Sequence, residues 1–176
     1  MATSCALTQG YSLDCRDSIG GVKEFHVIEF DNVTTITAAA GVITGITKAT
    51  GKRFWKYALI KQTGMAEELI EANEENGTVF YNQMFKAPLN KLQASVRNEL
   101  ALLSKNRLML VWVDGNGVAW LFGKANAVLV NTGSKTMSGT KMGDRNGYEL
   151  DFIGHEPELA YQVDAATLAT LETPGA

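Results

Sequence analysis

The amino-acid sequence predicts a mainly β fold, an antiparallel β-sandwich or barrel with one flanking α-helix, long loops and terminal arms. Seven or eight short segments are β-branched or alternate apolar and polar residues, and most are separated by turn residues. A single segment, residues 89–106, repeats apolar residues at helical spacing. The chain has 176 residues, three prolines and no internal repeat, which indicates one domain over 1–176. Within it we expect an N-terminal arm over 1–21 and an acidic C-terminal arm over 154–176.

Strands in the first half are expected at 22–30, 53–62, 65–72 and 78–86. The Thr/Ala/Gly-rich segment 31–51 fits either a weak strand or a long ordered loop. Both faces of 53–62 are substantially apolar, which predicts a strand covered on both sides. Asn76-Gly77 favours a hairpin turn, so the last three of these strands would form an antiparallel meander.

The second half begins with the predicted helix, which Pro88 opens and whose apolar stripe would cover one face of a sheet. Strands are then expected at 108–113, 118–122, 127–130 and 148–153, with a Gly/Ser/Thr/Lys-rich loop over 132–146. In the last strand Glu149 and Asp151 alternate with apolar residues, so they should share a face.

Charge is unevenly distributed along the chain. The net charge is −3, but residues 1–145 carry +3 and the last 31 residues carry −6. A mildly acidic chain is not expected to coat nucleic acid, whereas a basic body with an acidic end suits head-to-tail contacts between copies. One such contact would join the basic segment 48–61 of one copy to the acidic tail of another.

No residue pattern in the sequence is typical of a catalytic, cofactor or metal site, so we expect no enzyme, no cofactor and no metal. His26 and His155 have no partner residues that the sequence ties to them. Cys5 and Cys15 are too far apart for a redox or zinc motif, and no secretory signal or membrane span is visible. The glycine-rich stretch 45–53 has the wrong spacing for a phosphate-binding loop.

Two motifs carry a resemblance to a known class of proteins. Residues 139–152 (GTKMGDRNGYELDF) and 15–21 (CRDSIGG) resemble virion structural proteins of tailed bacteriophages, particularly those that infect Bacteroidetes. The order of long loop, strand meander, single helix, hairpin and last strand is similar to that of tail-tube proteins. Such subunits are β-sandwiches with a flanking helix. They form hexameric rings, share a continuous inner barrel and stack through loops and arms.

The resemblance implies synthesis in the bacterial cytoplasm and a place in the virion tail. The implied partners are other copies of the chain, other tail proteins and DNA that passes non-specifically through the lumen. No membrane and no small-molecule substrate is expected. The alternatives are another virion component (a neck, ring, tail-completion or capsid-decorating protein) or a stand-alone ligand-binding β-sandwich.

The resemblance also suggests roles for particular residues. Carboxylates that line a lumen would repel DNA, and the candidates are Glu67 and Glu71 on one strand, or Glu149 and Asp151 on another. The alternative is that both pairs simply face solvent. Segments 31–51 and 132–146 are the loops expected to become ordered on assembly. The candidate contacts between subunits are Arg16, Asp17, Lys48, Lys52, Arg53, Lys141, Asp144, Arg145, Glu156 and Glu158.

Overall fold

A computed structural model describes residues 7 and 9–176, which form strands, two α-helices and a short 3-10 helix, η1 (Phe30–Asn32). The strands are β1 (Val22–Glu29), β2 (Val33–Ala39), β3 (Val42–Lys48), β4 (Trp55–Ala58), β5 (Met65–Asn73), β6 (Thr78–Asn90), β7 (Leu108–Asp114), β8 (Ala119–Phe122), β9 (Val128–Val130), β10 (Lys135–Met137), β11 (Gly147–Glu156) and β12 (Tyr161–Val163). The α-helices are α1 (Ala94–Leu103) and α2 (Ala165–Thr170).

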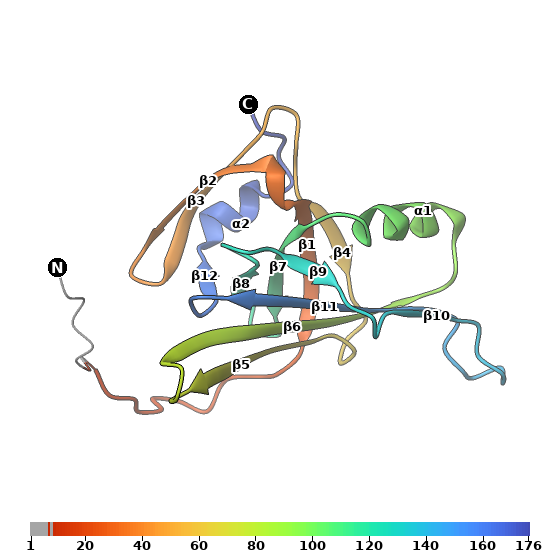
Figure 1. The fold of residues 1–176 in the computed structure, drawn as a ribbon. Coiled ribbons are helices and arrows are strands. Elements are labelled where there is room, and N and C mark those ends of the chain that lie inside the picture. Colours follow the sequence, from red (N-terminus) through yellow and green to blue (C-terminus); the bar gives the residue numbers. More distant parts are fainter. Residues whose placement is uncertain (1–6, 8) are drawn as a thin grey trace.

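The strands form one hydrogen-bonded sheet that folds over into two layers (Figure 1). The first layer has the order β2-β3-β12-β8-β7-β1-β4, and the second has the order β9-β11-β6-β5, with β10 also on β11. Leu108 pairs with Val128 and joins the layers through β7 and β9, and a separate bridge links Val22 of β1 to Gly64, the residue before β5. The mainly β fold with a flanking helix is therefore confirmed, although the sheet is mixed because β12 runs parallel to β3.

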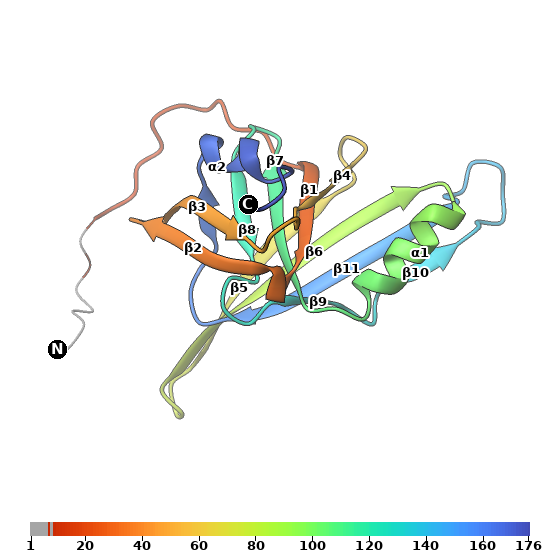
Figure 2. The ribbon, with the colours of Figure 1, turned by 90° about the horizontal axis from the view of Figure 1, so that it is seen from above.

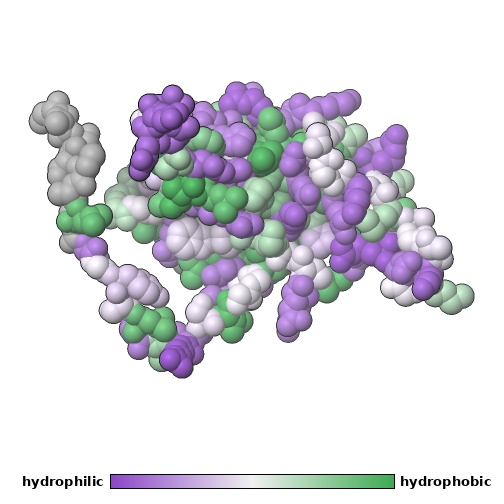
Figure 3. All heavy atoms as spheres, turned by 60° about the horizontal axis from the view of Figure 1, so that its bottom comes forward, coloured by the Kyte–Doolittle hydropathy of each residue, from purple (hydrophilic) through white to green (hydrophobic). Residues whose placement is uncertain are grey.

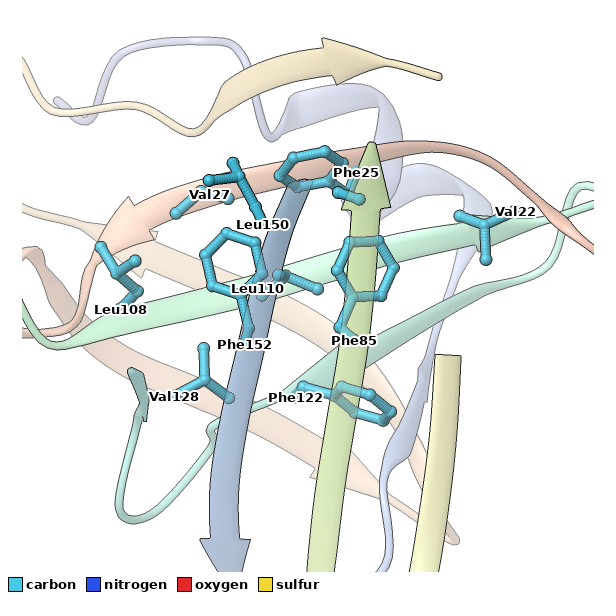
Figure 4. Close-up of a cluster of buried hydrophobic side chains, with 11 residues drawn as sticks. Val22, Phe25, Val27, Phe85, Leu108, Leu110, Phe122, Val128, Leu150 and Phe152 are labelled. Atoms are coloured by element: carbon cyan, nitrogen blue, oxygen red, sulfur yellow. The ribbon is translucent and has the colours of Figure 1, made fainter. Parts of the chain in front are cut away.

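The main core lies between the two layers (Figure 4). Phe25 of the first layer meets Phe85 and Phe152 of the second, with ring centroids 5.1 and 6.0 Å apart. All three side chains are almost fully buried, and burial of each contributes about 2–3 kcal/mol. The alternation of apolar residues in β1, β6 and β11 is what directs one face of each strand into this core.

A second core covers the outer face of the first layer. Met109 and Val111 of β7 pack there with Ile43 of β3 and with Leu171, which follows α2. Because Leu108 and Leu110 point into the main core instead, β7 is buried on both faces. This explains why its sequence is continuously apolar rather than alternating.

Segment 31–51 is a hairpin of β2 and β3, so the strand alternative is confirmed and the long-loop alternative is wrong. The turn is made by Ala40 and Gly41, which both adopt positive φ angles of 50° and 81°. Two consecutive residues with positive φ match the twist of a tight hairpin. Alanine is an unusual residue at such a position, which is why the sequence did not mark this turn.

The expected meander is also wrong, because β4 pairs with β1 and not with β5. Only four residues form β4, and Trp55 keeps 53% of its surface exposed, so the strand is not covered on both sides. Alternation shows which residues share a face, but it does not identify the neighbouring strand. The β5–β6 hairpin, by contrast, forms as predicted from Asn76-Gly77.

The flanking helix α1 begins at Ala94 and not near Leu89, because β6 continues to Asn90. Pro88 lies opposite Glu149 of β11, and β5 begins only opposite Lys86. The nitrogen of Pro88, which carries no hydrogen, therefore points to the side of β6 that has no neighbouring strand at this level. Proline is tolerated at such a position. Only the last part of the helix, through Leu100 and Leu103, packs against the core.

Residues 154–176, expected as an arm, lie on the body of the fold. They complete β11, form β12 between β8 and β3, and continue through α2 to Gly175, which pairs with Thr50. The expected arm over 1–21 is described only in part, because residues 1–6 and 8, including Cys5, lie outside the described residues. Residues 9–20 are extended and exposed. Neither α-helix is long and apolar enough to cross a bilayer.

Candidate functional site

The four acidic residues proposed for a lumen lie on one face of the second layer. Glu67 of β5 pairs with Met84 of β6, which pairs in turn with Ile153 of β11. Because the adjacent Phe85 and Phe152 point into the core, this row of side chains points outward. We call this surface the open face; it comprises Met65, Glu67, Leu69, Glu71, Phe80, Asn82, Met84, Lys86, Leu129, Lys135, Glu149, Asp151, Ile153 and His155.

No helix of the described chain covers the open face. In Figure 1 both α1 and α2 lie on the other side of β6 and β11. Figure 3 brings the underside of that view forward and shows hydrophilic and hydrophobic side chains intermixed on it. An antiparallel sheet with one face in a core and the other uncovered is stable in this form, so the face is available for contact.

Ion pairs divide the open face into a neutral end and an acidic end. The carboxylate of Glu149 forms ion pairs with Lys135 Nζ and with Arg145 Nη1, each at 3.0 Å. These two contacts hold the pKa of the Glu149 carboxyl below its usual value. Glu67 and Glu71 make no ion pair with any described residue. Asp151 makes no ion pair with a described residue either, but it lies directly opposite Lys86 of β6, so most of the uncompensated negative charge lies along β5.

The acidic end coincides with a free sheet edge. Gly64, just before β5, bridges to Val22 of β1, but residues 65–73 pair within the described chain only with β6, so their other edge carries unpaired backbone groups. The β5–β6 hairpin also extends beyond the rest of the fold (Figure 2). Near its tip Ile70 and Val79 keep 64% and 56% of their surfaces exposed. Exposed apolar side chains beside an unpaired edge are typical of a surface that another chain covers.

The opposite margin of the same layer has no excess of negative charge, because β10 and the loop after it carry Lys135, Lys141 and Arg145 against Asp144, beside Glu149 of β11. Here β10 pairs only with β11, and the loop that follows it lies at the far end of the molecule from the hairpin (Figure 2). Asp144 Oδ2 accepts hydrogen bonds from the backbone N–H groups of Thr140 (2.9 Å) and Lys141 (2.8 Å), which fixes the loop. The side chains of Lys141 and Met142 are left exposed at its end.

No match to this chain is found among protein-family models, curated proteins or solved structures. The described residues also contain no group of three or more His, Cys, Asp or Glu side chains able to hold a metal ion. A hollow of about 820 Å³ lies where the N-terminal segment meets residues 59–62. Its charged lining residues are Lys23 and Lys61, which provide no acid–base pair.

Two of the predicted contacts between subunits are buried within the chain. Lys48 Nζ donates to the carbonyl oxygens of Thr170 (2.7 Å), Leu171 (3.2 Å) and Thr173 (2.7 Å), and burial lowers its pKa. Glu156 accepts hydrogen bonds from two backbone N–H groups of 125–126, and burial raises its pKa. Segment 48–61 thus meets the C-terminal segment inside one copy, and neither residue can serve as the proposed contact.

The other predicted contacts are accessible but do not form one cluster. Arg53 stacks over the ring of Trp55 at 4.1 Å, beside β4. Glu158 binds Lys124 Nζ at 3.0 Å on another part of the surface. Arg16, Asp17 and Lys52 are exposed, and Lys141, Asp144 and Arg145 belong to the loop after β10.

Asn116 anchors the N-terminal segment, a role that no sequence pattern indicates. Asn116, in the turn between β7 and β8, accepts a hydrogen bond from Ile19 N (2.9 Å) and donates to Ile19 O (3.0 Å). Gly115 N also donates to Gly21 O at 2.8 Å. The sequence Asp114-Gly-Asn-Gly is typical of a turn, but nothing local shows that its asparagine binds a segment about one hundred residues away.

Proposed function

We propose that this chain is a structural subunit of a tailed-phage virion that assembles into stacked, hexameric rings and forms the tail tube. The open face would line the channel through which DNA leaves. One observation carries the proposal: Glu67, Glu71, Glu149 and Asp151, from two strands far apart in sequence, share one uncovered sheet face. DNA is densely negative, so a wall that presents carboxylates and few free cations does not retain it.

The N-terminal segment supports assembly independently of the open face. It is held to the body near Ile19 and otherwise extends away, with Tyr11 and Leu13 exposing 89% and 60% of their surfaces. Figure 1 shows it running along the outside of the fold. An extended segment with exposed apolar side chains gains stability when a second copy covers them, which suits a contact between stacked rings.

Electron microscopy of the purified protein over a range of concentrations tests this function. We expect six-fold rings that stack into hollow tubes as the concentration rises. Rings that never stack would favour a neck or ring component over a tail-tube subunit. A monodisperse monomer at high concentration, measured by analytical ultracentrifugation, would contradict self-assembly altogether and favour a stand-alone binding domain.

A further inference from the structure

The two opposite margins of the open face differ in charge and are both unpaired. We infer that copies of this chain join head to tail, with the β5 edge of one copy beside the β10 edge of the next, so that the open face continues across the junction. This inference rests on the proposed function and specifies which surfaces meet. The partner is a second copy of the same chain.

Strand direction is compatible with this junction. Along the second layer β10, β11, β6 and β5 are each antiparallel to the next, so β5 runs opposite to β10. When a second copy is related to the first by rotation about the axis of a ring, the β10 of the second copy runs antiparallel to the β5 of the first. The alternation of directions is then unbroken around the assembly, and every junction is identical, as a closed ring requires.

Charge favours the contact between unlike edges. Residues 62–85, which contain β5 and its hairpin, have five glutamates and no lysine or arginine. Residues 135–146, which are β10 and the loop after it, have Lys135, Lys141 and Arg145 against Asp144, a net charge of +2, and Lys141 makes no ion pair with a described residue. These edges therefore attract each other, whereas two β5 edges brought together would repel.

Two other free edges fit this role less well. The outer edge of β4 is flanked by Lys52, Arg53 and Lys61 and is therefore also basic, but it belongs to the first layer, so pairing there would not extend the open face. The outer edge of β2 lies at the far margin of that layer, and β2 has no charged residue. Only β10 combines a charge opposite to that of β5 with a place on the same layer.

The positions of the two edges along the strands indicate a staggered junction. Strand β10 lies opposite residues 147–149 of β11, which pair with 88–90 of β6, whereas β5 begins opposite Lys86. Strands that close into a barrel are tilted and staggered by a fixed amount, so edges at different heights are what closure needs. The stagger also explains how the projecting hairpin can lie against a neighbouring copy.

Cysteine cross-linking tests the junction. In a Cys5→Ser, Cys15→Ser background, Ala72→Cys places a thiol on exposed β5 and Thr136→Cys places one on exposed β10. A flexible bis-maleimide is then added to the protein under conditions in which microscopy shows rings. The matched control combines Ala72→Cys with Thr35→Cys on β2. Each single-cysteine variant is treated in parallel.

We expect a ladder of cross-linked species from the Ala72–Thr136 pair and no comparable product from the control pair or from either single variant. A dimer from Ala72→Cys alone would overturn the inference, because it would show that two β5 edges meet. Rings without the ladder would overturn it and leave the proposed function intact. The absence of rings in the unmodified protein would overturn both.

Discussion

Lys135 Nζ lies 3.0 Å from Glu149 Oε2, across the pair of strands at one end of the open face. With Arg145 on the other carboxylate oxygen, this contact balances the charge that the sequence had marked as a candidate for repelling DNA. Glu67 and Glu71, at the other end, have no such partner among the described residues. The two predicted acidic pairs are therefore not equivalent, and β5 carries the larger share of the expected repulsion.

Removal of both β5 carboxylates should make the channel retain DNA. We expect assembled tubes of the double variant Glu67→Gln, Glu71→Gln to co-sediment with short double-stranded DNA at low salt, whereas unmodified tubes leave it in solution. Rings should still form, although at a higher protein concentration, because the backbone edge of β5 and three of the five glutamates in residues 62–85 are unchanged. The matched control, Glu99→Gln on α1, removes a carboxylate away from the open face. Equal DNA retention by control and double variant would contradict a repulsive lining.

Lys141 should contribute to assembly through long-range charge. Its side chain is exposed on the loop after β10, and Lys141→Glu places a negative charge beside the acidic β5 of the next copy. We expect a higher protein concentration to be needed for rings, measured by sedimentation velocity, with a smaller difference at high salt. Lys105→Glu, which alters an exposed lysine after α1, should leave assembly unchanged. A shift of the same size in both variants would indicate a general effect of net charge.

Lys48 should hold the C-terminal segment in place. Lys48→Met keeps the aliphatic stem but removes the donor to three carbonyl oxygens, so we expect a loss of about 2 kcal/mol in the free energy of unfolding. Hydrogen exchange should rise first in residues 170–176. Lys52→Met, which changes an exposed lysine nearby, should have little effect in either measurement. Unchanged exchange in the C-terminal segment of Lys48→Met would refute the assigned role.

His26 should make the fold less stable in acid. Its imidazole is 3% exposed, and burial lowers its pKa despite the carboxylates of Glu24 (3.5 Å) and Glu172 (4.0 Å), with Lys56 also close to Glu24. The folded state therefore binds fewer protons than the unfolded state. The stability of the folded state is therefore fully present above the ordinary histidine pKa of about 6.5. It falls as the pH drops from there through the lower pKa that His26 has in the folded state.

Urea unfolding at pH 7 and at pH 5 measures this effect. We expect the difference in the free energy of unfolding between the two pH values to be smaller in His26→Gln than in the unmodified protein. His155→Gln changes an exposed histidine and should keep the full difference. The same difference in all three proteins would show that carboxylates, and not His26, cause the acid sensitivity.

Local patterns predicted those elements whose folding signals are themselves local. The alternation in 148–153 correctly predicted a strand with Glu149 and Asp151 on one face, and the apolar residues that alternate with them are buried. Asn76-Gly77 correctly located a hairpin. The partner of β4 and the end of β6 were missed, because both depend on which strand lies alongside. That information resides in long-range packing and not in any window of the sequence.

The candidate site also has features that local patterns predict and features that depend on long-range packing. Each acidic pair could be assigned to one face of its own strand, but the sequence could not show that β5 and β11 flank the same strand, β6. No local sequence pattern predicts that Lys48 is buried. A lysine in a Thr/Gly-rich segment is expected in solvent, and it becomes buried here only because three carbonyl groups from the far end of the chain converge on it.

The last residues of the described chain are tied to the side of the molecule that faces away from the open face. Thr50 Oγ1 donates to the carbonyl oxygen of Ala176 at 2.9 Å, and in Figure 1 this end of the chain lies opposite β5 and β6. A peptide or reporter protein fused after Ala176 would therefore project from the outer wall of a ring and leave the bore unobstructed. The proposed tube would then be a scaffold whose exterior can be decorated at one regularly repeated position per subunit.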